Sequence, residues 1–190
     1  MTEVILQTLS RYTPISAETA KALSNVAEIK QLAEYEFLEK ESSKISSEFI
    51  VLEGIVRAYV SDYNGEDITI NFYSSGQAIT PAILRGVHSQ SAYNLQVLSK
   101  TASILIFNNT RMENEMQHFP DLQQFGYNVI MQDSLRRVER EVVLLKETAR
   151  NKLNWFRKNF PGLENQVQHY HIASFLGITP TSLSRIRAEI

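Results

Sequence analysis

Near its C-terminus the chain reads Ile172-Ala173-Ser174-Phe175-Leu176-Gly177-Ile178-Thr179-Pro180-Thr181-Ser182-Leu183-Ser184-Arg185-Ile186-Arg187. A helix-turn-helix needs apolar residues where its two helices face each other, a small residue at their crossing and glycine at the turn. Apolar residues have the spacing of those buried positions: Ile172, Leu176, Ile178, Leu183 and Ile186. Ala173 is the small residue at the crossing, and Gly177 can adopt the positive φ of the turn. The stretch therefore predicts a helix-turn-helix.

The second helix of this motif carries polar residues suited to double-stranded DNA. Thr179 is a suitable N-cap, and Pro180 suits the first turn. We expect these residues to form the DNA-binding surface: Thr179, Thr181, Ser182, Ser184, Arg185 and Arg187. The guanidinium of Arg185 can donate two hydrogen bonds to O6 and N7 of a guanine, whereas Arg187 is expected to contact a phosphate or solvent. The alternative is a plain pair of helices without a nucleic-acid role.

Composition and charge exclude several classes of protein. The 190 residues include no cysteine, which excludes disulfides, thiolate-ligated zinc, iron–sulfur clusters and thiol redox sensing. There is no apolar run of about 18 residues and no signal peptide, so we expect a cytoplasmic protein without a membrane partner. Residues 148–190 carry six Lys and Arg against two Asp and Glu, although the whole chain has a net charge of −2. A basic end on an acidic body suits phosphate binding.

The N-terminal part of the chain predicts helices followed by a small antiparallel barrel or roll. Residues 3–32 have a helical pattern, and from Glu36 the apolar period changes from near 3.6 to near 2. Short runs rich in β-branched and aromatic residues predict strands at Phe49–Leu52, Ile55–Val60, Ile68–Phe72 and Ala102–Phe107. Asn64-Gly65 predicts a hairpin between two of them, because both residues tolerate positive φ. Many short strands separated by turns are typical of a roll.

A long helix is predicted from Pro120 to Lys146, and a shorter amphipathic helix from Arg150 to Asn159. The long helix begins with an apolar stripe at Leu122, Phe125 and Val129, has a polar middle, and ends with Val138, Val142 and Leu145. Such a stripe suits dimerisation, which we favour, or packing on the roll. Apolar residues after position 150 are expected to form a small three-helix core: Leu153, Trp155, Phe156, Phe160, Leu163 and Val167.

The order of these parts resembles the cyclic-AMP receptor protein and fumarate–nitrate regulator (Crp/Fnr) family of bacterial transcription factors. Three segments carry the resemblance: Phe49–Arg57, which includes Leu52-Glu53-Gly54; Asn64–Ile70 with Phe72 and Gly76; and His171–Arg187. The resemblance implies an α+β fold. An N-terminal antiparallel β-roll, a double-stranded β-helix of the cyclic-nucleotide-binding kind with flanking helices, would cover residues 1–118. A long dimerisation helix would cover 119–147, and a winged-helix-like helix-turn-helix domain 148–190.

The resemblance also implies partners. It implies a homodimer that couples a small-molecule effector in the roll to a DNA operator, with RNA polymerase as a further partner. The corresponding effector segment contains Gly76, Thr80, Pro81, Gln90, Ser91 and Ala92. Members of the family that bind cyclic nucleotides have a Glu for the ribose and an Arg for the phosphate, and here Pro81 and Gln90 stand in those places. We therefore expect an effector other than cyclic AMP, or a vestigial pocket, with nearby Arg85 at the surface.

The family's recognition helix commonly begins with Arg-Glu, whereas this chain has Pro180-Thr181, which predicts a different operator. We also expect no β-wing, since Ile190 soon follows the second helix. No nucleophile, carboxylate pair or phosphate loop predicts an enzyme or a cofactor. His169 and His171 are expected to be structural or close to DNA rather than metal ligands, and His88 and His118 are isolated. The rival interpretation is a ligand-sensing or protein-interaction module that has lost DNA binding.

Overall fold

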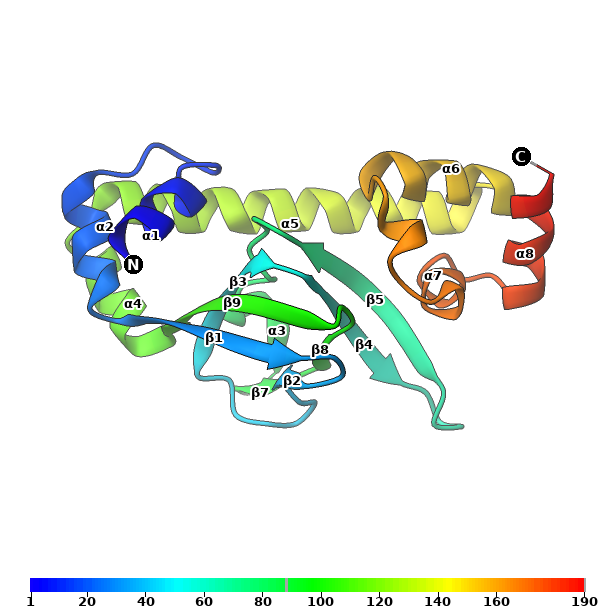
Figure 1. Ribbon diagram of the computed structural model, residues 1–190, viewed down its shortest axis with the longest axis horizontal. Coiled ribbons are helices and arrows are strands. Elements are labelled where there is room, and N and C mark those ends of the chain that lie inside the picture. The colour runs from blue at the N-terminus through cyan, green and yellow to red at the C-terminus, as the bar shows by residue number, and fades with distance from the viewer. Residues whose placement is uncertain (88, 190) are drawn as a thin grey trace.

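The computed structural model describes residues 1–87 and 89–189. His88 and Ile190, named above as an isolated histidine and as the end without a wing, lie outside the described residues. The fold is α+β, as predicted, and its parts are arranged along one long helix, α5 (Pro120–Lys146) (Figure 1). The N-terminal helices gather at one end of α5, the sheets lie beside its middle, and the C-terminal helices lie at its other end (Figure 1). Among the described residues, no helix is both long and apolar enough to cross a membrane.

The strands form the predicted antiparallel roll. One sheet has the order β1-β9-β3, formed by Ala27–Ala33, Thr101–Asn108 and Ser47–Glu53. The other has the order β2-β8-β4-β5, formed by Phe37–Glu39, Asn94–Val97, Ile55–Ser61 and Asp67–Ser74. The short helix α3 (Ala82–Arg85) precedes a small hairpin of β6 (Gly86–Val87) and β7 (Gln90–Ser91). Apolar side chains of both larger sheets fill the roll, including Val51, Val56, Tyr73, Leu95 and Ile104.

The predicted hairpin joins β4 to β5. Strand β5 stands last in the order β2-β8-β4-β5, so it is an edge strand of its sheet. The Asp62 amide donates to the carbonyl oxygen of Glu66 at 2.9 Å, which closes the loop. Gly65 has φ +82°, so the turn uses the positive φ at glycine. Asn64 is not among the residues with positive φ, and its amide is instead bonded by the Asp62 carboxylate.

The helical prediction for residues 3–32 is wrong in its last part. Helices α1 (Thr2–Leu9) and α2 (Ala17–Ser24) form, but Ala27–Ala33 is strand β1. The sequence of β1, AEIKQLA, consists mostly of good helix formers. Antiparallel pairing with β9, in the register Ala27 to Phe107, satisfies its backbone and outweighs this local preference.

The N-terminal helices are fastened to α5 and to α4 (Asn109–Met116) by apolar packing and by hydrogen bonds. The Ser16 hydroxyl caps α2 by accepting from the Thr19 amide at 3.0 Å. The Asp121 carboxylate, in the first turn of α5, accepts from the Ser16 amide and from the Thr19 hydroxyl, both at 2.8 Å. These bonds fix where α5 starts relative to α2.

Helix α5 has the predicted bounds and uses two faces. Leu122, Phe125 and Val129 are buried against the roll and the N-terminal helices, so the packing alternative is correct for the first half. A second stripe is between 40 and 81% exposed: Met131, Leu135, Val138, Val142 and Leu145. Its spacing alternates between three and four residues, which is the pattern of a coiled-coil seam. The sequence pattern placed the apolar group from Leu122 to Val129 and the group from Val138 to Leu145 in one stripe. In the structure the first group is buried and the second is exposed.

The C-terminal helices are α6 (Ala149–Asn159), the short 3₁₀ helix η1 (Leu163–Asn165), α7 (His169–Phe175) and α8 (Pro180–Ala188). They share the predicted small core, in which Leu153, Phe156, Ile172 and Leu183 are almost fully buried. Phe72 of β5 enters the same core and contacts three aromatic rings edge-on: Phe156, Phe160 and Phe175, at centroid distances of 5.3 to 6.0 Å. A residue of the roll thus completes the core of the C-terminal helices.

Candidate functional site: nucleic-acid interface and ligand pocket

Helices α7 and α8 have the predicted helix-turn-helix geometry. Gly177 has φ +61°, and the Ile178 amide donates to the carbonyl oxygen of Ala173 at 3.0 Å, which ends α7 tightly. Ala173 is fully buried, as expected of the small residue where the helices cross. The Thr179 hydroxyl accepts from the Ser182 amide at 3.1 Å, so Thr179 is the N-cap of α8.

The predicted DNA-contacting residues do not all share one environment. Thr181, Ser184 and Arg185 are exposed on α8, which lies at the end of the molecule remote from the roll (Figure 1). Within the described part of the chain, no carboxylate lies within ion-pair distance of Arg185. Ser182 is half-buried, and its hydroxyl accepts from that of the capping Thr179 at 2.9 Å. The side chain of Arg185 is therefore the best placed to reach a ligand.

Arg187 has a protein partner that the sequence did not indicate. Its Nε donates to Glu164 of η1 at 2.6 Å, and one of its terminal nitrogens donates to Nδ1 of His169 at 3.0 Å. Arg157 of α6 binds the same Glu164 carboxylate with two hydrogen bonds, at 2.6 and 3.0 Å. The hydrogen bonds from Arg157, together with those from Arg187, lower the pKa of Glu164. This network holds α6, η1 and α8 together, and it uses the guanidinium of Arg187.

Helix α7 is docked on the edge strand β5. The Ser174 hydroxyl donates to the carbonyl oxygen of Asp67 at 3.1 Å and accepts from the Thr69 amide at 2.9 Å. One side chain thus satisfies a backbone acceptor and a backbone donor on the open edge of the sheet. The first helix of the helix-turn-helix therefore covers β5, and α8 is left facing away from the roll (Figure 1).

A buried polar contact joins the same two parts. Arg57 of β4 donates to Nδ1 of His171 at 2.7 Å, to Asp67 at 2.6 Å and to the side-chain oxygen of Gln96 at 2.9 Å. His171 is only 2% exposed. Burial, with the neighbouring Arg57 cation, lowers the pKa of His171 from 6.5 to about 4. The imidazole is therefore neutral at pH 7, and it serves as an acceptor between α7 and the roll.

The six predicted effector residues do not converge on one cavity. Thr80 is fully buried, and its hydroxyl is bonded to the Tyr73 hydroxyl and donates to the Asp133 carboxylate, both at 2.7 Å. Ser91 is buried and donates to the carbonyl oxygen of Tyr93, whereas Gln90 and Ala92 are exposed. Gly76 lies beneath the guanidinium of Arg11 and does not line the cavity described below. Pro81 alone among the six lines the cavity described below.

The expectation that Arg85 lies at the surface is wrong. It is fully buried, and its Nε and Nη2 donate to the two carboxylate oxygens of Glu39 at 2.8 and 3.1 Å. Further hydrogen bonds go to the backbone carbonyl oxygens of Thr80 and Ser47. Because its charge is matched by Glu39, with Glu48 at 3.5 Å, Arg85 is not available to neutralise a ligand phosphate.

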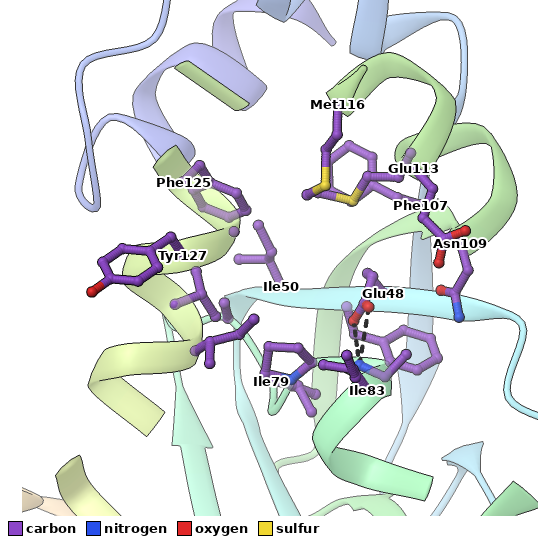
Figure 2. Close-up of a pocket in the computed structure, with 18 of the residues that line it drawn as sticks. Glu48, Ile50, Ile79, Ile83, Phe107, Asn109, Glu113, Met116, Phe125 and Tyr127 are labelled. Carbon is purple, nitrogen blue, oxygen red and sulfur yellow. Dashed lines mark hydrogen bonds between the residues drawn. The ribbon is translucent and has the colours of Figure 1, made fainter. Parts of the chain in front are cut away.

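A largely apolar cavity of about 420 Å³ lies between the roll, α4 and α5 (Figure 2). Phe125 and Tyr127 border it from α5, Glu113 and Met116 border it from α4, and Ile79 and Ile83 lie across from them (Figure 2). Its volume is in the range of small-molecule sites, and its walls are mainly hydrocarbon. The cavity can therefore hold a small apolar molecule.

The polar groups of this cavity are mainly acceptors. Glu48 accepts from the Ala82 amide at 3.0 and 3.1 Å (Figure 2). Burial raises the pKa of Glu48, partly offset by nearby Arg85. The side-chain oxygen of Asn109 is buried and has no hydrogen-bond donor among the described residues. A bound molecule would therefore need donors, and an anionic phosphate would be repelled by Glu48 and Glu113.

Comparison with known proteins found no matching family model and no curated relative. Solved structures do match. FixK2 of Bradyrhizobium japonicum is 15% identical, with a TM-score of 0.73 over 86% of this chain and 84% of its own. CLP, a c-di-GMP-responsive global regulator of Xanthomonas campestris, is 12% identical, with a TM-score of 0.71 over 92% and 91%. A transcriptional regulator of the Crp/Fnr family from Eubacterium rectale is 13% identical, with a TM-score of 0.72 over 94% and 87%.

These likenesses extend over most of each chain and include both the roll and the C-terminal helices. At this level of identity they establish the architecture and not the ligand or the operator. With its roll, long helix and helix-turn-helix in this order, the chain has the fold of the Crp/Fnr transcription regulators.

Proposed function

We propose that this protein is a homodimeric, sequence-specific DNA-binding transcription regulator of the Crp/Fnr type. The observation that carries the proposal is the exposed face of α8, with Thr181, Ser184 and an Arg185 that forms no ion pair with the described residues, on a helix held by a buried helix-turn-helix core. Two such helices in a two-fold dimer would enter successive major grooves about one helical turn apart.

The first experiment is selection of genomic DNA fragments by the purified full-length protein, at two salt concentrations. We expect a palindromic motif, and an affinity that falls as salt rises, because phosphate contacts release counterions. Replacing Arg185 with Ala should weaken binding to the selected site by roughly 1–3 kcal/mol and relax one operator position. Arg111→Ala is the matched control, since Arg111 is an exposed arginine on α4, at the opposite end of the molecule. Failure to enrich a motif at either salt concentration would contradict the proposal.

Dimerisation would use the exposed stripe of α5. Leu135 lies in the middle of that stripe and is 62% exposed in the single chain. A carboxylate there would be buried in the paired seam without a partner, so Leu135→Glu should give a monomer in sedimentation velocity. Asn154→Glu adds the same charge at an exposed position of α6 and should remain dimeric. A wild-type monomer at micromolar concentration would contradict a dimer built on this stripe.

The effector that we propose is a small apolar molecule with hydrogen-bond donors, bound in the cavity between the roll, α4 and α5 (Figure 2). Two observations disfavour a cyclic nucleotide. Arg85 is already paired with Glu39, and Pro81 and Gln90 supply no charge to bind the ribose or the phosphate. Millimolar cyclic AMP should therefore leave the melting temperature unchanged. A saturable rise of several degrees would show that the protein does bind this nucleotide.

A second candidate function is a sensing or protein-interaction module that no longer binds DNA. The observation in its favour is the engagement of Arg187 by Glu164, which leaves mostly neutral groups on the α8 surface. Such a module would show no salt-dependent affinity for DNA, so the selection experiment at two salt concentrations separates the two proposals.

A further inference from the structure

A second cavity, of about 480 Å³, lies where the roll, α5 and the C-terminal helices meet. Its walls come from three parts of the chain: Ile70 and Tyr73 of β5, Leu144 of α5, and Trp155, Phe160 and Phe175 of the C-terminal core. These side chains offer flat and aliphatic surface on several sides. The cavity is separate from the one in Figure 2, with which it shares no lining residue.

Three arginines of α5 line this cavity: Arg136, Arg137 and Arg140. Arg137 is paired with Asp133 at 2.6 Å, and Arg136 donates to a backbone carbonyl oxygen of its own helix at 3.3 Å. The carboxylate that lines the cavity is Glu141, which is exposed. The charges that face the cavity are therefore predominantly positive.

Arg140 is the least compensated of the three. One of its terminal nitrogens donates to the carbonyl oxygen of Phe175 at 2.8 Å, and its guanidinium lies 4.4 Å from the centroid of the Phe175 ring. Its Nε is buried and has no acceptor among the described residues. Burial, together with the like charge of Arg137, lowers the pKa of Arg140 to about 10. A buried donor without an acceptor is destabilising, and an anion beside the guanidinium would offset its uncompensated charge.

We propose that this cavity is a binding site for a small organic anion, with a flat apolar body against the aromatic cluster and a carboxylate or phosphate group at Arg140 and Arg136. The apolar body would lie against the cluster of Trp155, Phe160 and Phe175, and the acidic group would pair with the guanidinium charge of Arg140, whose Nε has no acceptor among the described residues. The occupant would touch β5, α5 and α7 at once, so it would hold the helix-turn-helix in its docked position. This last consequence depends on the proposed DNA-binding function, whereas the site itself does not.

The test is isothermal titration calorimetry of the full-length protein with three probes that share one ring system: 2-naphthoate, 2-naphthyl phosphate and neutral 2-naphthalenemethanol. We expect one or both anions to bind about tenfold or more tightly than the alcohol, and the tighter anion identifies the preferred acidic group. Arg140→Gln should remove most of the difference in affinity between the anions and the alcohol.

Arg140→Gln also removes a hydrogen bond to the end of α7, so a second variant is needed. Arg136→Gln keeps that bond and should still weaken both anions severalfold. Arg111→Gln, which removes an exposed arginine outside the cavity, should not. If the protein binds the alcohol as tightly as the anions, the cavity is an apolar site without a preference for an acidic group. If the Arg140 and Arg136 variants both keep the wild-type affinity for the anions, the anions bind elsewhere. Neither result requires DNA, so each leaves the proposed DNA binding standing.

Discussion

Lowering the pH should release α7 from the roll, because His171 must stay neutral to accept the hydrogen bond from Arg57. The pKa of His171 is about 4 in the docked state and 6.5 in an undocked, solvated state. The undocked state therefore binds more protons between these values, and docking is lost as the pH falls from about 6.5 toward 4. Above pH 6.5 the contact contributes in full.

The size of the effect follows from that interval. Each pH unit between the two pKa values corresponds to about 1.4 kcal/mol, so the full loss is on the order of 3 kcal/mol at pH 4. At pH 5 the loss is roughly 2 kcal/mol, which shifts the docking equilibrium about 30-fold. The charged groups that surround the ring are Arg57 and Asp67.

The Thr69 amide is a local reporter of docking, because its hydrogen bond is to the Ser174 hydroxyl on α7. We expect its hydrogen-exchange protection, corrected for the intrinsic rate at each pH, to fall about 30-fold between pH 7.5 and pH 5. His171→Gln keeps an acceptor for Arg57 and cannot titrate, so its protection should not vary with pH. An equal fall in this variant would refute the assignment to His171.

Three further predictions concern stability. Phe72→Ala should cost about 3–5 kcal/mol, because it empties the centre of an aromatic cluster, and urea unfolding followed by Trp155 fluorescence measures this. Thr179→Ala should cost about 1 kcal/mol through loss of the α8 cap, and Thr179→Ser should restore most of it. Glu39→Gln should cost about 3 kcal/mol or more, since it leaves the buried charge of Arg85 without its main partner. Wild-type thermal or urea midpoints in these variants would contradict the packing, the cap and the ion pair, respectively.

The sequence predicted the parts of the fold that have strong local signals. Gly177, Ala173 and the apolar positions around them defined the helix-turn-helix. Helix α5 begins at Pro120 and ends at Lys146, as predicted. Strand β1 was missed because its residues favour helix, and only its pairing with β9 makes it a strand. Local patterns do not contain that non-local partner.

The candidate sites were less predictable than the fold, because they depend on contacts between distant segments. Arg85 lies in a short helix whose sequence gives no sign of burial, and Glu39, its partner, is 46 positions away. Likewise nothing around Glu164 marks it as the partner of Arg187. Ser174 is a polar residue on α7, the first helix of the helix-turn-helix, and the sequence shows that much. The sequence does not show that its hydrogen-bond partner lies on β5.

The way in which Ser174 covers β5 limits how the C-terminal helices can move. Departure of α7 would expose the Thr69 amide, the Asp67 carbonyl and the ring of Phe72 along one strand edge. An uncovered edge with an aromatic side chain invites strand exchange with another copy and aggregation. A helix-turn-helix that often left β5 would therefore make the protein prone to aggregate. At neutral pH any second arrangement must supply β5 with a new cover, so we expect the molecule there to alternate between two closed states without populating an open one.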